Sequence, residues 1–192
     1  MRTRNGGLIA LAWLLALLAT PSVMAQQADQ IQAALNAAYA RYKDIKEGKN
    51  ADYIPALARV DPKIFGIALV TTDGKVYTAG DVKSEVSIQS ISKVFTMAKV
   101  MEQQGPDAIV KRIGVDATGM RFNSIVAVEF AEKALGGPEI NPLVNPGAIT
   151  ATSMVQGNSR DEVWQSILDF HSDFAGRPLR VDKEVFDSEA AS

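Results

Sequence analysis

One hairpin signal constrains the fold of this chain more than any other feature. Residues 64–71 are apolar and rich in β-branched side chains, and residues 75–79 form a second short stretch of strand character. Asp73 and Gly74 lie between them, and an Asp-Gly pair favours the tight turn that joins antiparallel strands. Because two strands alone make a marginal sheet, helices or further strands have to support this hairpin.

Helical periodicity runs through much of the remaining chain. Apolar residues recur every three to four positions over residues 30–47, so a helix is expected there that ends at Gly48. A loop follows at 51–62. Beyond the hairpin, helices are expected from about Ser90 to Gln104 and over 108–113, 145–156 and 161–174, with a loop at 114–124. This order predicts an α+β domain with an antiparallel sheet flanked by helices.

Residues 1–25 have the pattern of a secretory signal peptide. Arg2 and Arg4 form a basic start, residues 8–19 are an apolar run shorter than the roughly 20 residues of a membrane span, and 23–25 supply the small-residue cleavage pattern. We therefore expect a periplasmic or secreted protein whose domain is residues 26–192, without a stable membrane span after cleavage. An uncleaved N-terminal anchor is the alternative.

Composition narrows the available chemistry. The chain has no cysteine, which excludes disulfides, thiol nucleophiles and Cys-ligated zinc. Its formal net charge is −2 and it has no basic stripe, so nucleic acid is not an expected partner. His171 is the only histidine, and its place in a helical pattern predicts a helix-surface residue. A Ser-His-Asp triad would need this residue, but the chain has no G-x-S-x-G elbow to accompany it.

Ser90 and Lys93 form the strongest candidate for a reactive pair. Residues three apart on a helix lie on nearly the same side, so the Lys93 amine can reach toward the Ser90 hydroxyl. A serine nucleophile needs a base. Lys93 becomes half neutral near pH 7 if its pKa falls by about 3.4 units, and burial can shift a lysine pKa by about 3 to 5 units. The Ser90 amide, at a helix start, can also help to bind an oxyanion.

The expected helix has an apolar face that would supply this burial. The residues at helical spacing predict a buried stripe made of Ile91, Val94, Phe95, Ala98 and Met101. The first three of these flank Lys93. A purely structural interpretation stays open, because serine is a favoured helix cap and lysine is a common helix-surface residue.

Five sequence blocks carry a more specific signal than the Ser-x-x-Lys motif. In chain order they are ADYIPALA (51–58), DGKVYTAGD (73–81), SIQSISKV (87–94), GMRFNS (119–124) and NPLVNPGAI (141–149). Together they resemble the serine-dependent glutaminase family, whose domain is similar to β-lactamases and penicillin-binding proteins. The resemblance covers about 51–192. It implies a β-lactamase/transpeptidase-like fold, hydrolysis of L-glutamine to L-glutamate and ammonia, no metal or other cofactor, and a homo-oligomer, specifically a homotetramer.

The resemblance also implies roles for individual residues. Ser90 matches the nucleophile that forms a glutamyl ester, and Lys93 matches the general base. Glu189 matches the carboxylate that holds the α-ammonium group of the substrate, because FDSEAAS looks like the start of the Ser-Glu block of the family. The residues implied to contact or border the substrate are Ser90, Asn145, Glu189, Tyr53 and Gln89.

Each of these assignments has a simpler alternative. Asn145 could cap the helix that it starts, Tyr53 could be a core aromatic, and Glu189 could belong to a frayed terminus. Asn123, in the GMRFNS block, is expected to be a loop or turn residue.

The chain departs from the family pattern in two ways. Pro146 stands where the family usually has alanine, which a helix start tolerates. The chain also ends at Ser192, before a second binding asparagine, the catalytic tyrosines, further strands and an oxyanion-hole amide, so we expect a domain that is incomplete at its C-terminus. A β-lactamase or D-Ala-D-Ala peptidase is an alternative that shares Ser-x-x-Lys, although no Ser-Asp-Asn is present. A non-catalytic, truncated remnant is another.

Overall fold

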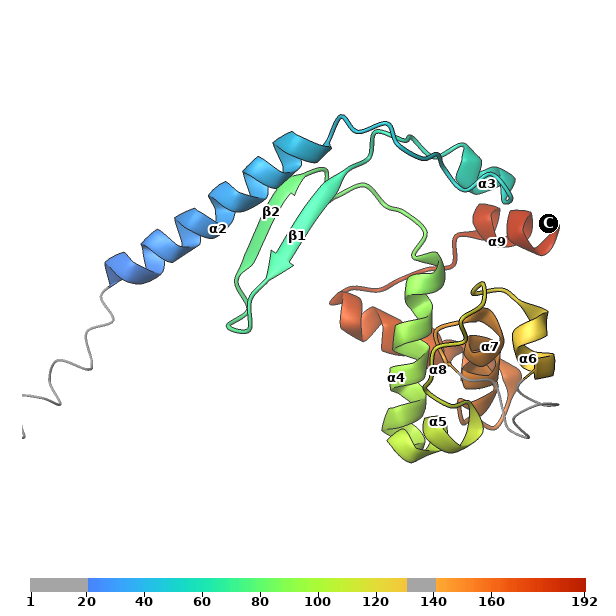
Figure 1. Ribbon diagram of the computed structural model, residues 1–192. Helices are drawn as coiled ribbons and strands as arrows, with labels where there is room; N and C mark the ends of the chain where they lie inside the picture. Colours follow the sequence, from blue (N-terminus) through green and yellow to red (C-terminus); the bar gives the residue numbers. More distant parts are fainter. Residues whose placement is uncertain (1–20, 131–140) are drawn as a thin grey trace, which may run out of the picture. The chain divides into compact units, whose positions relative to one another are not determined.

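The computed structural model describes residues 21–130 and 141–192, which form two compact units (Figure 1). One unit holds the chain up to Val86 together with Asp187–Ser192, and the other holds Ser87–Phe186. Residues 1–20, most of the predicted signal peptide, lie outside the described part. None of the described helices combines the length and the apolar character that crossing a bilayer requires.

The first unit contains the predicted hairpin and the helix that covers it. Strands β1 (Gly66–Val70) and β2 (Val76–Gly80) pair antiparallel, with Val70 opposite Val76. The Gly74 amide donates to the Thr71 carbonyl at 2.9 Å, so the hairpin prediction is confirmed. Helix α2 (Pro21–Tyr42) packs along the hairpin, as Figure 1 shows.

Two contacts hold α2 to the hairpin. The Gln32 side chain donates to the Thr78 carbonyl at 2.9 Å, and the Tyr39 ring stacks on Phe65 with 5.5 Å between ring centroids. Gly80 allows the second contact, because a Cβ at this position would lie 2.1 Å from the Tyr39 ring. Gly80 also has a φ of 74°, which favours glycine over other residues.

Helix α2 differs from its predicted bounds of 30–47 at both ends. It starts at Pro21. It ends at Tyr42 because residues 43–48 are mostly charged and all exposed, including Ile45, so they offer no apolar face to bury. A short helix, α3 (Pro55–Ala58), lies within the predicted loop.

The second unit is a cluster of helices around α4 (Ser92–Gln104). The one-turn 3-10 helix η1 (Gln89–Ile91) leads into it, and α5 (Pro106–Arg112), α7 (Asn145–Met154) and α8 (Arg160–Ala175) pack against it (Figure 1). Two further helices, α6 (Ile125–Phe130) and α9 (Lys183–Ala190), were not predicted, and α9 contributes residues to both units. The buried core of this unit consists of Val100, Ile109, Ile113, Ala151 and Val155.

The helix predictions in this unit are largely confirmed. Helix α8 begins at a cap in which Ser159 accepts from the Glu162 amide at 3.2 Å, and it ends at Gly176, whose φ is 63°. Pro106 starts α5, two residues before the predicted start, and α7 ends two residues before the predicted end. Residues 114–124 form turns and loops, as predicted.

The predicted buried stripe on α4 is wrong. Ile91 is 62% exposed, Val94 46% and Met101 38%, and the buried positions are instead Thr96 and Val100. Apolar residues occupy more than half of the circumference of this helix, so periodicity alone did not identify the arc that packs on α5, α7 and α8.

The surface position predicted for His171 is also wrong. His171 is buried, with 7% of its surface exposed, and its ring meets Phe95 edge-on at 5.6 Å between centroids. It lies four and eight residues after Ile167 and Val163, which pack against the core of this unit. That spacing places all three on the inner face of α8.

Gly80→Ala should destabilise the protein more than Gly74→Ala. Both residues have positive φ, so alanine costs about 1–2 kcal/mol of backbone strain at either site. Gly74 has open space around it, but at Gly80 the new methyl group meets the Tyr39 ring, which adds about 1–3 kcal/mol. Urea unfolding of the two variants measures the difference. Equal losses would show that the Tyr39 contact does not restrict this position.

Candidate active site

Ser90 lies in the single 3-10 turn that leads into α4. The turn covers Gln89–Ile91, and α4 begins at Ser92, so Ser90 stands at a helix start as predicted. Its residue is exposed. A hydroxyl at such a position is accessible to a substrate, and its backbone amide belongs to the first turn of a helix.

The residue before Ser90 is strained. Gln89 has a φ of 44°, and within residues 21–130 and 141–192 it is the only residue other than glycine with a positive φ. The Gln89 carbonyl accepts hydrogen bonds from the Ser92 hydroxyl at 2.7 Å and from the Ser92 amide. The Gln89 side chain donates to the Ser87 hydroxyl at 2.9 Å. Strain of this kind costs about 1–3 kcal/mol and persists only where the surroundings enforce it.

Lys93 is partly buried, and burial lowers the pKa of its ammonium group below the ordinary lysine value. The direction agrees with the prediction for a general base, but the predicted source of burial does not, because Ile91 and Val94 are exposed. One aromatic neighbour is Phe122, whose ring centroid lies 5.5 Å from the Lys93 nitrogen.

Asn145 is the partner of Lys93. The Lys93 nitrogen donates a short hydrogen bond to the Asn145 side-chain oxygen, which brings together residues 52 positions apart in the chain. The helix-cap interpretation of Asn145 is therefore wrong, because α7 has Val144 at its cap position and no side-chain cap bond. Two predicted site residues from different helices thus meet directly.

The loop around α7 explains how Asn145 reaches this position. Its backbone amide donates to the Phe122 carbonyl at 2.7 Å. Gly147 packs so closely on the Asn141 carbonyl that a Cβ would lie 1.9 Å from that oxygen. The glycine of the NPGA sequence therefore lets the first turn of α7 approach the preceding loop, which fixes the direction of the Asn145 side chain.

Ser90 and Lys93 share no hydrogen bond among the described residues, since the Lys93 bond goes to Asn145. A neutral amine can donate one hydrogen to the Asn145 oxygen and still offer its lone pair to a hydroxyl proton. Catalytic hydrogen bonds often tighten only once substrate is bound. The arrangement therefore suits Lys93 to the role of a base.

Tyr53 and Glu189 belong to the first unit, where both are exposed. Tyr53 is 67% exposed and is not the predicted core aromatic, since the buried side chain is its neighbour Ile54. The segments of Tyr53 and Glu189 meet, because the Ala56 amide donates to the Ser188 hydroxyl at 3.1 Å. Glu189 is the last residue but one of α9, so the segment that carries it is helical.

Phe122 is the site residue that the sequence reasoning missed. It belongs to the GMRFNS block, in which only Asn123 was expected, as a loop or turn residue. Phe122 contacts Lys93 with its ring and Asn145 with its carbonyl. No periodicity marks a loop aromatic as functional, so only the position of that block in an ordered set of motifs could have indicated it.

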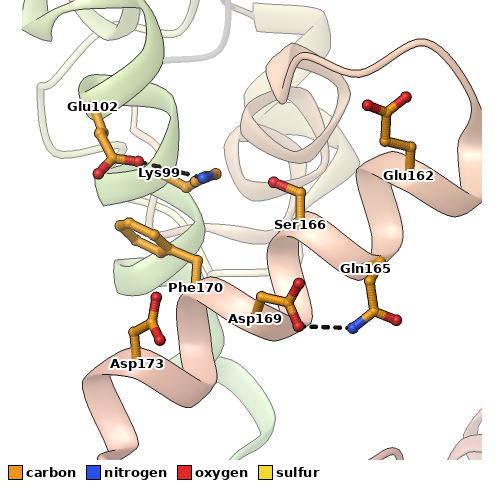
Figure 2. Close-up of a pocket in the computed structure, with 8 residues that line it drawn as sticks. All are labelled: Lys99, Glu102, Glu162, Gln165, Ser166, Asp169, Phe170 and Asp173. Atoms are coloured by element: carbon orange, nitrogen blue, oxygen red, sulfur yellow. Dashed lines mark hydrogen bonds and ion pairs between the residues drawn. The ribbon is translucent and has the colours of Figure 1, made fainter.

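An open groove between α4 and α8, with a volume of about 530 Å³, is separate from these residues (Figure 2). Half of its lining residues are acidic. The Lys99 nitrogen lies 4.8 Å from the Phe170 ring centroid and 3.3 Å from a Glu102 carboxylate oxygen. None of the predicted site residues lines it. The lining residues are Lys99, Glu102, Glu162, Gln165, Ser166, Asp169, Phe170 and Asp173.

Comparisons with known proteins converge on one family. The sequence model of the family described as Glutaminase matches residues 48–192. A glutaminase of Colwellia psychrerythraea is 49% identical over 160 residues, which are 83% of this chain and 50% of the relative. A glutaminase of Brucella canis is 45% identical over 166 residues, 86% of this chain and 51% of the relative. The chain thus spans about half the length of the curated relatives that it matches.

Solved structures give the same result. The structure of the probable glutaminase ybaS has a TM-score of 0.81 and 41% identity, and the match covers 86% of this chain and 52% of that one. A probable glutaminase from Bacillus subtilis complexed with 6-diazo-5-oxo-L-norleucine has a TM-score of 0.67 and 28% identity, over 83% of this chain and 46% of that one. These glutaminases have the β-lactamase-like fold, so the predicted fold class is confirmed.

Asn145→Asp should raise the pKa of Lys93. A carboxylate in place of the amide oxygen stabilises the ammonium form, and an opposite charge within about 4–6 Å shifts a pKa by about 1–3 units. A titration of the Lys93 side chain by ¹³C NMR measures the change. Asn36→Asp is the control, because it introduces the same charge at a side chain whose hydrogen-bond partner is Gln32 and not Lys93. It should leave the Lys93 titration unchanged. An unchanged Lys93 titration in Asn145→Asp would show that the two side chains do not interact in solution.

Proposed function

This chain belongs to the glutaminase family, and we propose that it hydrolyses L-glutamine to L-glutamate and ammonia through an acyl-enzyme formed on Ser90. The observation that carries this proposal is the Lys93 environment. Burial lowers the pKa of Lys93, its amine is held by Asn145, and it lies three residues after an exposed serine.

In the first half of the proposed reaction, the Ser90 hydroxyl oxygen attacks the side-chain amide carbon of glutamine. Neutral Lys93 accepts the hydroxyl proton and then delivers it to the departing nitrogen, so ammonia leaves and a glutamyl ester remains. The Ser90 backbone amide contributes one hydrogen bond to the oxyanion that forms in between.

In the second half, water attacks the ester carbon while Lys93 takes a proton from it. The bond from the carbon to the Ser90 oxygen breaks, the proton returns to that oxygen, and glutamate is released. The same base serves both halves, which requires that Lys93 return to its neutral form after each. A lowered pKa makes that return easier near neutral pH.

Further contacts with the substrate are proposed from the resemblance to the family. Asn145 can offer its amide to a carboxylate or an amide of the substrate, and Glu189 can pair with the α-ammonium group. Tyr53 and Gln89 are proposed to border the bound amino acid. Support for Tyr53 and Glu189 is their exposure and the hydrogen bond between Ala56 and Ser188 that joins their segments.

Ser90→Ala and Lys93→Ala should each abolish most of the ammonia release from glutamine. Removing the nucleophile lowers kcat by several orders of magnitude, and removing a general base lowers it by about 10²–10⁴. Ammonia release by the purified protein measures both. Ser153→Ala and Lys111→Ala are matched controls on exposed positions of α7 and α5 and should retain activity.

Three results would contradict this proposal. Undiminished ammonia release in Ser90→Ala would exclude the serine mechanism. Absence of ammonia release from the unsubstituted chain would favour a non-catalytic protein. Hydrolysis of a β-lactam without hydrolysis of glutamine would favour the penicillin-binding alternative.

We further propose that the protein is exported and assembles as a homo-oligomer. The basic start, the apolar run and the cleavage pattern of residues 1–25 support export, and family membership supports assembly as a homotetramer. Expression in a bacterium with an outer membrane should yield periplasmic protein whose first residue is Gln26, with a native mass of four chains. Mass spectrometry under denaturing conditions identifies the first residue, and a retained Met1 would contradict cleavage of the signal peptide. Mass spectrometry under native conditions gives the mass of the assembly, and a monomer mass would contradict the homo-oligomer.

A further inference from the structure

The only histidine of the chain is buried where helix α8 meets the start of α4. Its Nδ1 lies 2.7 Å from the Ile167 carbonyl oxygen of its own helix, and its Nε2 lies 3.3 Å from the Ser92 carbonyl oxygen. Only 7% of its surface is exposed. Both ring nitrogens therefore face carbonyl groups, which accept hydrogen bonds and cannot donate them.

Ser92 is the residue that stabilises the strained turn before it. Its hydroxyl and its amide both donate to the Gln89 carbonyl, and the amide also donates toward the Ser90 carbonyl. These bonds hold the Gln89–Ser90 peptide in a conformation that Gln89, with its φ of 44°, would not adopt by itself. A contact that holds Ser92 in place therefore also orients Ser90 within the turn.

We propose that His171 is a positioning residue for Ser90, acting through an Nε2–H hydrogen bond to the Ser92 carbonyl. The proposal rests on the proposed function, since it gives His171 a purpose only if Ser90 is the nucleophile. His171 does not act on substrate. It ties the turn before α4 to the inner face of α8, and Ser92 passes this restraint to the Gln89–Ser90 peptide.

The position of the contact supports a tether in addition to packing. The imidazole packs edge-on against Phe95, a role that any apolar ring could fill. An apolar ring would leave the Ser92 carbonyl without this donor, however. A neutral imidazole carries one N–H. A proton on Nδ1 serves the shorter contact, 2.7 Å to the carbonyl of its own helix, whereas a proton on Nε2 serves the 3.3 Å contact with α4, so the tether requires the Nε2–H form.

Two amide substitutions separate these roles. In His171→Gln the side-chain NH₂ can reach the place of Nε2, and in His171→Asn it can reach only the place of Nδ1. In His171→Asn, the Ile91 and Ser92 amides should exchange with solvent about tenfold faster. This ratio corresponds to a decrease of about 1.4 kcal/mol in the free energy of local opening. In His171→Gln these rates should return to near those of the unsubstituted protein.

The controls are the Ala151 and Val155 amides, which belong to the core of the same unit and should keep their exchange rates in both variants. Unchanged exchange at Ile91 and Ser92 in His171→Asn would overturn the proposal. Equal acceleration at all four amides would also overturn it, because that result indicates lost packing.

The protonation of the His171 ring can also be measured in the unsubstituted protein, so this test does not depend on the folding of a variant. Long-range ¹H–¹⁵N NMR of the imidazole shows which nitrogen carries the proton. A proton on Nε2 supports the tether, and a ring protonated on Nδ1 alone overturns it.

Kinetics connect the tether to catalysis. His171→Asn should lower kcat for glutamine about tenfold with little change in KM, and His171→Gln should restore kcat. A rise in KM alone would contradict a positioning role. If the unsubstituted chain releases no ammonia, the proposed glutaminase function fails by itself, while hydrogen exchange and NMR still decide whether His171 holds the turn.

Discussion

Packing of α4 against α5, α7 and α8 is the constraint on which the site depends. Val100 and Ile113 are fully buried at the centre of this contact, and complete burial of such a side chain contributes about 1.5–3 kcal/mol. Because α4 cannot rotate without exposing Val100, the turn before it is held in one place. Asn145, at the start of α7, is thereby brought to Lys93, which lies in the first turn of α4. The reactive groups are peripheral, but the core determines their geometry.

The state of Lys93 reflects a balance between opposing effects. Desolvation disfavours its charged form, whereas the Phe122 ring, which faces the ammonium, favours it. Desolvation prevails, so the pKa falls. The Asn145 oxygen is a suitable partner in this setting, because a neutral acceptor bonds the amine without fixing its charge as a carboxylate would. The same asparagine can orient Lys93 and remain compatible with the proposed role of this lysine as a base.

Backbone strain among the described residues is concentrated at Gln89, the residue before the proposed nucleophile. Gln89 adopts a left-handed backbone, and the Ser92 hydroxyl and amide both donate to its carbonyl. The buried His171 ring contacts the carbonyl of the same Ser92. A helix start alone would place Ser90 only approximately. Additional hydrogen bonds to the turn restrict Ser90 further. The proposed reaction needs this restriction, because the hydroxyl oxygen has to be placed within a few tenths of an ångström of the position from which it attacks a carbonyl carbon.

The sequence by itself determined most of the elements, although not α3, α6 and α9, and it indicated the chemistry that is proposed for them. The Asp73-Gly74 turn and the helix end after Gln104 are local signals, because each follows from the backbone preferences of one or two residues. The proposed pairing of Ser90 with Lys93 followed from helical spacing, and the family followed from ordered motifs. Only the tertiary structure decided which arc of α4 is buried, that His171 is inside, and that Lys93 meets Asn145 and Phe122. These features depend on contacts between residues far apart in the chain. In α4, apolar side chains cover more than half of the helix circumference, so the local pattern does not indicate which of them face the core.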